Sequence, residues 1–216
     1  KGVELYVNAI LVQKDKFTYS IDFAGNSQFN ELSTLSNEFY SADYLEYGFL
    51  PSPGNLGAAI RIEEGGQVGN FYGKRFAGFN EDGKWLFYKE DGSAVPASQI
   101  APGDLAVIGN GVPKYMASLS NNFSYKNWDL TVFFRVKFDY DILNTQDLYF
   151  GKKAWLPNNL LKSAITKNAD LNDNPQFSDY YLENGSFVKL DNVTLGYNFN
   201  LKGKAVRNFR VYATGR

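Results

Sequence analysis

The sequence contains no cysteine and no histidine, and these absences remove much of the chemistry that proteins carry out at defined sites. Without cysteine there is no disulfide framework and no thiolate metal site, and without histidine the commonest general base and metal ligand is missing. The net charge is only −1, from 22 basic and 23 acidic residues, so no electrostatic footprint for nucleic acid is present. We therefore predict no catalytic residue, no metal site, no cofactor and no nucleic-acid partner.

Long hydrophobic runs are lacking as well. No segment approaches the roughly 18 to 20 consecutive apolar residues that a membrane-spanning helix requires. The amino end, "KGVELYVNAILVQKD", begins directly with a strand-like alternation and does not have the pattern of a targeting signal. The chain is instead rich in Phe, Tyr and Gly, with 18, 15 and 20 residues, and these favour strands and turns. Any membrane crossing would have to be made by strands.

Apolar and polar residues alternate with period two in six segments, which form three close pairs. The pairs are 3–12 with 17–25, joined by "QKDK"; 115–124 with 129–138, joined by "YKNW"; and the long strand 181–199 with 208–214, joined by "NLKGKAVR". Between the pairs lie long polar stretches rich in Gly, Pro, Asn and Asp, roughly 26–113 and 139–185, which exceed ordinary loop lengths.

Short turns at one end of the strands and long loops at the other are typical of outer-membrane barrels, where the turns are periplasmic and the loops extracellular. Strands of about 9 to 11 residues also suit a tilted crossing of the hydrocarbon layer. We predict an all-β fold of antiparallel transmembrane β-barrel strands with short periplasmic turns and long extracellular loops, as part of a larger barrel. A soluble β-sandwich stays an alternative, because the same alternation would serve a closed core.

In a barrel, the larger apolar side chains of each strand would face lipid. We predict lipid contact for Phe17, Tyr19, Ile21, Phe23, Leu130, Val132, Phe134, Val136, Val193, Leu195, Tyr197 and Phe199. Asp22, Arg135 and Lys137 occupy the opposite positions, where a water-filled interior would solvate them. Thr194 and Asn198 are expected on the same interior side.

The long stretches have features of their own. Two Asp-Gly turn signals flank "KWLFYKE" and predict a further β excursion. "LPNNLLKSAITKN" predicts a short helix, capped by Asn158 or Asn159, with Leu160, Leu161, Ala164 and Ile165 at helical spacing. Trp128 lies in a short turn and is expected at the membrane interface. The candidates for ligand or partner contact are Trp85, Trp155, Tyr180 and Tyr181.

The acidic clusters favour no specific site. Those at Asp139, Asp141 and Asp147 and at 170–174 lack the ligand spacing of an EF-hand loop and are interpreted as solvated charges. The pairs at 63–64 and 81–82 could be imagined as glycosidase carboxylates, but sequence does not supply the separation which that chemistry needs. Loop solubility accounts for them more simply.

Three stretches resemble a known family: "GVPKYMASLSNNFSYKNWDLTVFFRVKFDYDILN", "SDYYLENGSFVKLDNVTLGYNF" and "RNFRVYATG". Together they look like the carboxy-terminal barrel region of SusC/RagA-type TonB-dependent outer-membrane transporters. "SQFNELSTLS" and "GGQVGNFYGKRFAGF" resemble the preceding part, so the resemblance covers nearly the whole chain. The most specific combination is "YLENGSF" at 181–187 with "NVTLGY" at 192–197.

The resemblance implies a large barrel in the outer membrane of a Gram-negative, Bacteroidota-like bacterium. Residues 1–216 would be the carboxy-terminal part of that barrel, with the plug domain and the final strands absent. Such proteins import oligosaccharides or peptides together with a SusD-like surface lipoprotein, and the TonB complex acts through the amino-terminal region. We expect passage without chemical change, so no enzyme. The alternatives are a soluble carbohydrate-binding β-sandwich module and a secreted glycoside hydrolase fragment, and the residues do not identify the substrate.

Overall fold

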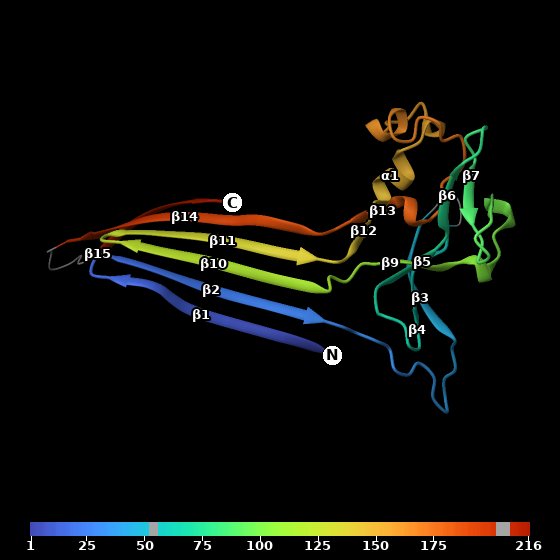
Figure 1. Cartoon of the computed structure of the whole chain (residues 1–216). Helices are drawn as coiled ribbons and strands as arrows, with labels where there is room; N and C mark the ends of the chain where they lie inside the picture. Colours follow the sequence, from blue (N-terminus) through green and yellow to red (C-terminus); the bar gives the residue numbers. More distant parts are fainter. Residues whose placement is uncertain (52–55, 202–207) are drawn as a thin grey trace. The chain divides into compact units, whose positions relative to one another are not determined.

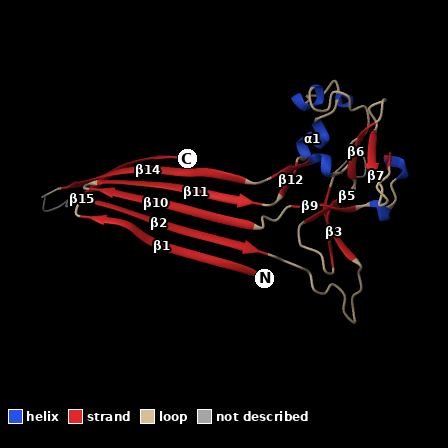
Figure 2. Ribbon diagram, in the orientation of Figure 1, coloured by secondary structure: helices blue, strands red, loops and turns tan. Residues whose placement is uncertain are grey.

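The computed structural model describes residues 1–51, 56–201 and 208–216. The chain divides into two compact units. The sheet unit consists of residues 1–29, 113–139 and 186–216, and the connecting unit consists of residues 30–112 and 140–185. The sheet unit is built mainly from strands, whereas the connecting unit combines short strands with loops and short helices (Figure 2). No helix among the described residues is long and apolar enough to cross a membrane.

The sheet unit is one antiparallel sheet of six strands, in the order β1-β2-β10-β11-β14-β15 (Figure 1). Its strands are β1 Gly2–Lys14, β2 Phe17–Gln28, β10 Tyr115–Tyr125, β11 Trp128–Phe138, β14 Phe187–Asn200 and β15 Asn208–Gly215. Only two residues separate β1 from β2, and two separate β10 from β11, so both turns lie at the same end of the sheet. The predicted turn "NLKGKAVR" lies largely outside the described residues. The all-β antiparallel prediction is confirmed.

The register places the apolar residues of neighbouring strands opposite one another. Near the turn end of the sheet, Tyr19, Phe123, Leu130, Leu195 and Ala213 form one row of paired positions. The Tyr19 and Phe123 rings stack with centroids 4.5 Å apart. Since a slip of one residue would move every side chain to the opposite side, this register fixes two distinct sheet surfaces.

The strand predicted over 181–199 is divided in the structure, because 182–184 form a short separate strand and β14 begins at 187. A bulge also interrupts β14 itself. Phe133 pairs with Asn192 and Phe134 pairs with Leu190, so Asp191 is an extra residue between them. The inserted residue breaks the strict alternation but returns Leu190 to the apolar side, which continues the sheet to its first residue at 187.

The connecting unit contains three small antiparallel sheets and several short helices. The four-stranded sheet is β3 Tyr44–Phe49, β4 Ala58–Glu63, β5 Asn70–Gly73 and β9 Ala106–Asn110; the three-stranded sheet is β6 Arg75–Phe79, β7 Trp85–Tyr88 and β8 Ala94–Pro96; the pair is β12 Asp141–Leu143 and β13 Leu182–Asn184. The helices are α1 Thr145–Phe150 and five 3-10 helices, η1 Ala97–Gln99, η2 Pro102–Asp104, η3 Lys153–Trp155, η4 Lys162–Ile165 and η5 Asp179–Tyr181. The β excursion predicted from "KWLFYKE" is confirmed as β7.

Aromatic and aliphatic side chains hold the connecting unit together. Its larger buried cluster is Trp85, Phe87, Leu148, Leu171 and Tyr181. The indole Nε1 of Trp85 donates to the carbonyl of Asn174 at 2.8 Å, so this large side chain is buried with its polar atom satisfied. The long stretches between the barrel strands therefore fold around a core of their own.

The helix predicted near 158–165 is wrong in extent and in its cap. Only the four-residue η4 forms there, and the Asn158 amide donates to the carbonyl of Trp155 without capping a helix. Ala164 is fully buried whereas Ile165 is 64% exposed, so the apolar residues at helical spacing do not bury a common face. The α-helix lies earlier, at α1, where the Asn144 side chain accepts from the Asp147 backbone N–H at 2.9 Å.

Candidate functional site

One surface of the six-stranded sheet is apolar. The pairing register places all twelve residues predicted to contact lipid on this side, together with Val3, Leu5 and Val7 of β1. Leu5 is 56% exposed and Leu195 is 46% exposed, so the described residues do not cover this surface. An extended apolar surface of this kind marks a contact with a membrane or with another protein. These residues therefore lie on the same side of the sheet, whereas their contact with lipid stays a prediction.

Aromatic residues border this apolar surface at both ends. Next to the two-residue turns, Phe17, Tyr125, Trp128 and Tyr197 occupy one row across four strands. The rings of Trp128 and Tyr197 meet edge to face with centroids 4.7 Å apart. At the opposite end of β10 and β11, Tyr115 pairs with Phe138. Two aromatic rows that flank an apolar band are the arrangement that barrels present to the two membrane interfaces.

The other surface of the sheet is polar and hydrogen-bonded across the strands. The Asp22 carboxylate accepts from the side-chain amides of Asn8 at 2.5 Å and Asn122 at 2.8 Å. The Asn122 side chain in turn accepts from the Thr131 hydroxyl at 3.1 Å. This chain of side chains spans β1, β2, β10 and β11, so the carboxylate predicted for the interior side has neutral partners on both neighbouring strands.

Two cations on the same polar surface neutralise the carboxylate of the bulge residue. Asp191, the bulge residue of β14, lies 3.1 Å from Arg135 of β11 and 2.8 Å from Lys189. Arg135 and Lys137 both lie on the polar side, opposite to the apolar Phe134 and Val136. The predicted division of each strand into a polar and an apolar side is therefore confirmed by the pairing.

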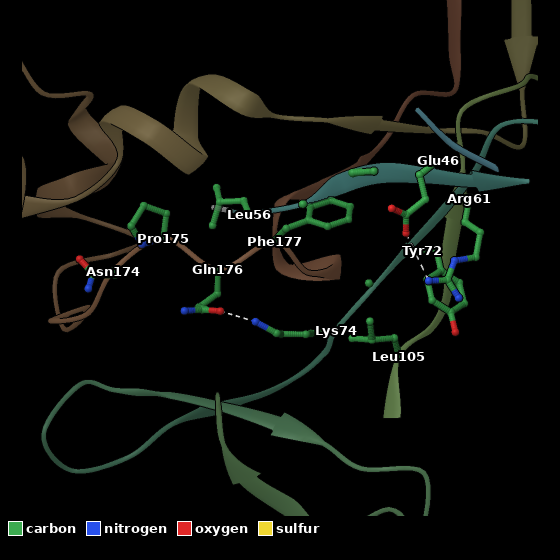
Figure 3. Close-up of a pocket in the computed structure, with 13 residues that line it drawn as sticks. Glu46, Leu56, Arg61, Tyr72, Lys74, Leu105, Asn174, Pro175, Gln176 and Phe177 are labelled. Atoms are coloured by element: carbon green, nitrogen blue, oxygen red, sulfur yellow. Dashed lines mark hydrogen bonds and ion pairs between the residues drawn. The ribbon is translucent and has the colours of Figure 1, made fainter. Parts of the chain in front are cut away.

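The connecting unit contains a cavity of about 500 Å³ (Figure 3). Its charged and amide side chains come from four parts of the unit: Glu46 of β3, Arg61 of β4, Lys74 after β5, and Asn174 and Gln176 of the segment before η5. Tyr72, Leu56, Leu105 and Phe177 supply its aromatic and apolar walls. The cavity therefore combines a few polar groups with apolar walls, as small-molecule sites do.

Arg61 is held in place from both neighbouring strands. Its guanidinium carbon lies 3.8 Å from the ring centroid of Tyr44 in β3 and 3.8 Å from that of Tyr72 in β5. An Nη atom also lies 3.3 Å from the Glu46 carboxylate, whereas the buried Nε has no hydrogen-bond partner. Stacking on aromatic rings suits the planar guanidinium and fixes its orientation. Arg61 and Glu46 therefore border the cavity as a neutralised pair.

Lys74 is the cavity cation without a carboxylate. Its ammonium group donates to the side-chain oxygen of Gln176 and lies 5.4 Å from the Phe87 ring centroid. The described part of the chain contains no ion pair to Lys74 within 4.0 Å. Burial lowers the pKa of this lysine, because removal from water disfavours the charged form.

The structure contradicts a contact role for two of the four predicted residues. Trp85 is 0% exposed and Tyr181 is 1% exposed, so both are core residues whose side chains do not reach a ligand or partner surface. Burial also raises the pKa of the Tyr181 hydroxyl. Tyr180 is half-buried and its hydroxyl donates to Asn168 at 2.6 Å, while Trp155 packs edge to face on Phe150. Contact by Tyr180 or Trp155 stays a prediction.

None of these four residues lines the cavity. Arg61 and Lys74, which do line it, were not among the residues predicted from the sequence. The available signal was a charge inside a short apolar strand, since Arg61 lies between Ile60 and Ile62. Among the described residues, no group of three or more His, Cys, Asp or Glu side chains is arranged to hold a metal ion.

Comparison with known proteins finds TonB-dependent receptors as relatives of this chain. No family model matches the chain. TonB-dependent receptor P3 of Formosa agariphila is 25% identical, with 100% of this chain and 23% of the relative covered. TonB-dependent receptor SusC of Bacteroides thetaiotaomicron is 26% identical, with 99% of this chain and 22% of the relative covered. The chain thus spans about a quarter of the length of these curated relatives.

Solved structures agree on the fold. A structure of the RagAB peptide transporter matches with a TM-score of 0.73 at 22% identity, covering 99% of this chain and 24% of that chain. The RagAB peptide importer in its "closed-closed" state matches with a TM-score of 0.75 at 23% identity, covering 99% and 25%. The resemblance to SusC/RagA-type TonB-dependent outer-membrane transporters is thus confirmed along the whole chain, which has the antiparallel strand fold of their barrels.

Proposed function

We propose that this chain forms wall strands and extracellular loops of a TonB-dependent importer in the outer membrane of a Gram-negative bacterium. One observation carries the proposal: a single sheet has an uncovered apolar surface bordered by aromatic rows, and its other surface is polar and hydrogen-bonded. A lipid-exposed outside and a wet inside require this pairing of surfaces. Similarity to TonB-dependent receptors along the whole chain supports the same assignment.

The finer parts of the proposal concern partners and cargo. Oligosaccharides or peptides would pass without covalent change, a SusD-like surface lipoprotein would deliver them, and the TonB complex would act on another part of the whole protein. RagAB, whose structures match this chain, is a peptide transporter, which supports the peptide alternative. The connecting unit has its own core, so it is suited to present a folded surface to a lipoprotein.

Fractionation and uptake test this function together. The whole protein should fractionate with the outer membrane, require detergent for extraction and show heat-modifiable migration. Cells that carry it should accumulate labelled oligosaccharides or peptides, and deletion of the TonB system should abolish accumulation. Recovery of the whole protein as a soluble species without detergent would contradict the membrane assignment. Accumulation that is unchanged without the TonB system would contradict the proposal that this system supplies the energy for uptake.

Deletion of part of 158–174 tests the lipoprotein contact. This segment follows the short helix η3 and includes the exposed residues Lys162 and Ile165. The shortened protein should co-purify less lipoprotein while its heat-modifiable migration is unchanged. Unchanged co-purification would assign the contact to another surface.

A further inference from the structure

The cavity of the connecting unit carries one positive charge that the protein leaves uncompensated. Glu46 and Arg61 neutralise each other at 3.3 Å, whereas the Lys74 ammonium has only the neutral Gln176 side chain as its hydrogen-bond partner. Figure 3 shows Lys74 directed toward Gln176, with the Arg61 and Glu46 pair on the other side of the cavity. A half-buried cation that lacks a counter-charge is costly, and an anion in the same cavity would offset that cost.

The remaining polar groups of the cavity favour a particular anion. The side-chain amides of Asn174 and Gln176 carry N–H donors and border the same space as Lys74. Because Glu46 and Arg61 neutralise each other, Lys74 supplies a single positive charge, which balances a group with one negative charge but not a group with two. Apolar walls from Leu56 and Phe177 suit the carbon skeleton that bears the charge. These features together match a carboxylate on an organic ligand better than an inorganic phosphate.

We propose that this cavity binds a carboxylate of the transported ligand, with the Lys74 ammonium as its anchor and the Asn174 and Gln176 amides as further donors. This deepens the proposed function, on which it rests for the view that the ligand is a nutrient. The carboxylate could belong to a uronate sugar or to an acidic peptide, and both present the same group to Lys74. Arg61 is a positioning residue here, because its contacts with the two tyrosine rings and the Glu46 carboxylate hold the cavity wall in place.

Equilibrium binding to the purified whole protein in detergent tests the proposal with defined probes. The acidic probes are trigalacturonate and a tripeptide of three glutamates, and the neutral counterparts are maltotriose and a tripeptide of three glutamines. At least one acidic probe should bind more tightly than its neutral counterpart. Binding of both acidic probes identifies the carboxylate alone as the recognised group, and binding of one identifies its source. Failure of both acidic probes to bind would overturn the proposal.

A pair of lysine variants locates the site. Lys74→Gln removes the charge and should weaken binding of the acidic probe about 10- to 100-fold, the range expected for loss of a charged hydrogen bond. Lys74→Arg keeps the charge and should recover most of that binding. Lys84→Gln is the matched control, because Lys84 also donates to an oxygen of the connecting unit but does not line the cavity. Equal binding by wild type and a folded Lys74→Gln variant would overturn the proposal.

A second measurement needs no variant and covers the case in which Lys74→Gln does not fold. Lys74 of the wild-type protein is labelled with an amine-reactive reagent and quantified by mass spectrometry. The acidic probe should protect Lys74 several-fold and leave Lys84 unprotected, and equal labelling with and without probe would overturn the proposal. Because both readouts are made without transport, a negative uptake experiment would contradict the proposed function while leaving carboxylate binding measurable.

Discussion

Arg210 of β15 reaches across strand β14 to form a two-point ion pair with Asp129 of β11. Its Nε donates to one carboxylate oxygen at 3.1 Å and an Nη donates to the other. The residue between them on β14 is Gly196, and a Cβ there would lie 2.5 Å from the Arg210 side chain and 2.6 Å from the Asp129 carboxylate. The absence of a side chain at 196 therefore allows this pair to close over the middle strand.

Gly196→Ala should break or displace that ion pair. The added methyl group must push Arg210 and Asp129 apart, so we expect the whole protein, folded in lipid vesicles, to unfold at a lower urea concentration. Gly215→Ala in β15 is the matched control, because no heavy atom lies within 4 Å of the added Cβ. That substitution should be neutral or slightly stabilising. Equal effects of the two substitutions would show that the ion pair between Arg210 and Asp129 does not contribute to stability.

The turns at one end of the sheet should be periplasmic. In a cysteine-free background, a cysteine in place of Asp15 or Asn127 should resist an impermeant thiol reagent on intact cells, because the outer membrane covers both turns. A cysteine in place of Lys162, an exposed residue of the connecting unit, should react readily and serves as the accessible control. All three should react after the membrane is permeabilised. Fast labelling at Asp15 or Asn127 on intact cells would reverse or refute the proposed topology.

The strands of the sheet unit were predictable because each carries a local, repeating signal. The alternation of Leu130 to Phe138 predicts β11 directly, and the observed strand begins one residue before the predicted one. The single strand predicted over 181–199 is too long at its beginning, because 182–184 pair with β12 as the separate strand β13 and β14 begins at 187. The bulge at Asp191 within β14 was not predicted either. A bulge depends on pairing with the neighbouring strand, so the sequence of one strand does not reveal it.

The connecting unit was less predictable because its structure depends on contacts between distant segments. Trp85 is a candidate for ligand or partner contact from the sequence because it lies in a long polar stretch, but its indole is buried by contacts that include the Asn174 carbonyl, 89 residues away. The cavity likewise brings Lys74 together with Gln176, 102 residues away in the chain. Neither pairing has a local sequence signal, so only the folded chain shows which aromatic is core and which cation lacks a counter-charge.

Trp85 and Trp155 should therefore respond very differently to substitution. Trp85→Ala removes a fully buried side chain and should destabilise the connecting unit by about 3 to 5 kcal/mol. Trp85→Phe keeps the aromatic bulk but leaves the Asn174 carbonyl without its donor, at a cost of about 1 to 3 kcal/mol. Trp155→Ala removes a half-buried ring that packs on Phe150 and should cost about 1 kcal/mol or less.

Limited proteolysis of the whole protein measures these effects, with heat-modifiable migration as the control for the barrel. The cleavage rate within 30–112 and 140–185 should rise sharply for Trp85→Ala, moderately for Trp85→Phe and little for Trp155→Ala. A Trp85→Ala protein that resists protease as well as the wild type does would contradict the assignment of Trp85 to the core. Trp85 would then again be a candidate for ligand or partner contact.

Adjacent residues of β14 should distinguish the lipid side from the interior. Leu195 pairs with Leu130 and Ala213 on the apolar side, whereas Thr194 pairs with Thr131 and Thr214 on the polar side. Arginine on the lipid face costs about 2 to 4 kcal/mol at the bilayer midplane and less near the interfaces, whereas the interior tolerates charge. Leu195→Arg should therefore reduce barrel stability and assembly much more than Thr194→Arg, as measured by urea unfolding in vesicles and by heat-modifiable migration.

A closed protein core would also reject arginine at 195, so a larger apolar side chain gives the sharper test. Leu195 is 46% exposed, and fluid lipid would accommodate the added volume of Leu195→Phe with almost no change in stability. A close-packed core would be destabilised by about 1 to 3 kcal/mol because overpacking forces neighbouring side chains out of their preferred rotamers. A destabilisation of that size by Leu195→Phe would mean that protein covers this surface in the whole molecule. It would then favour the soluble sandwich over the membrane barrel.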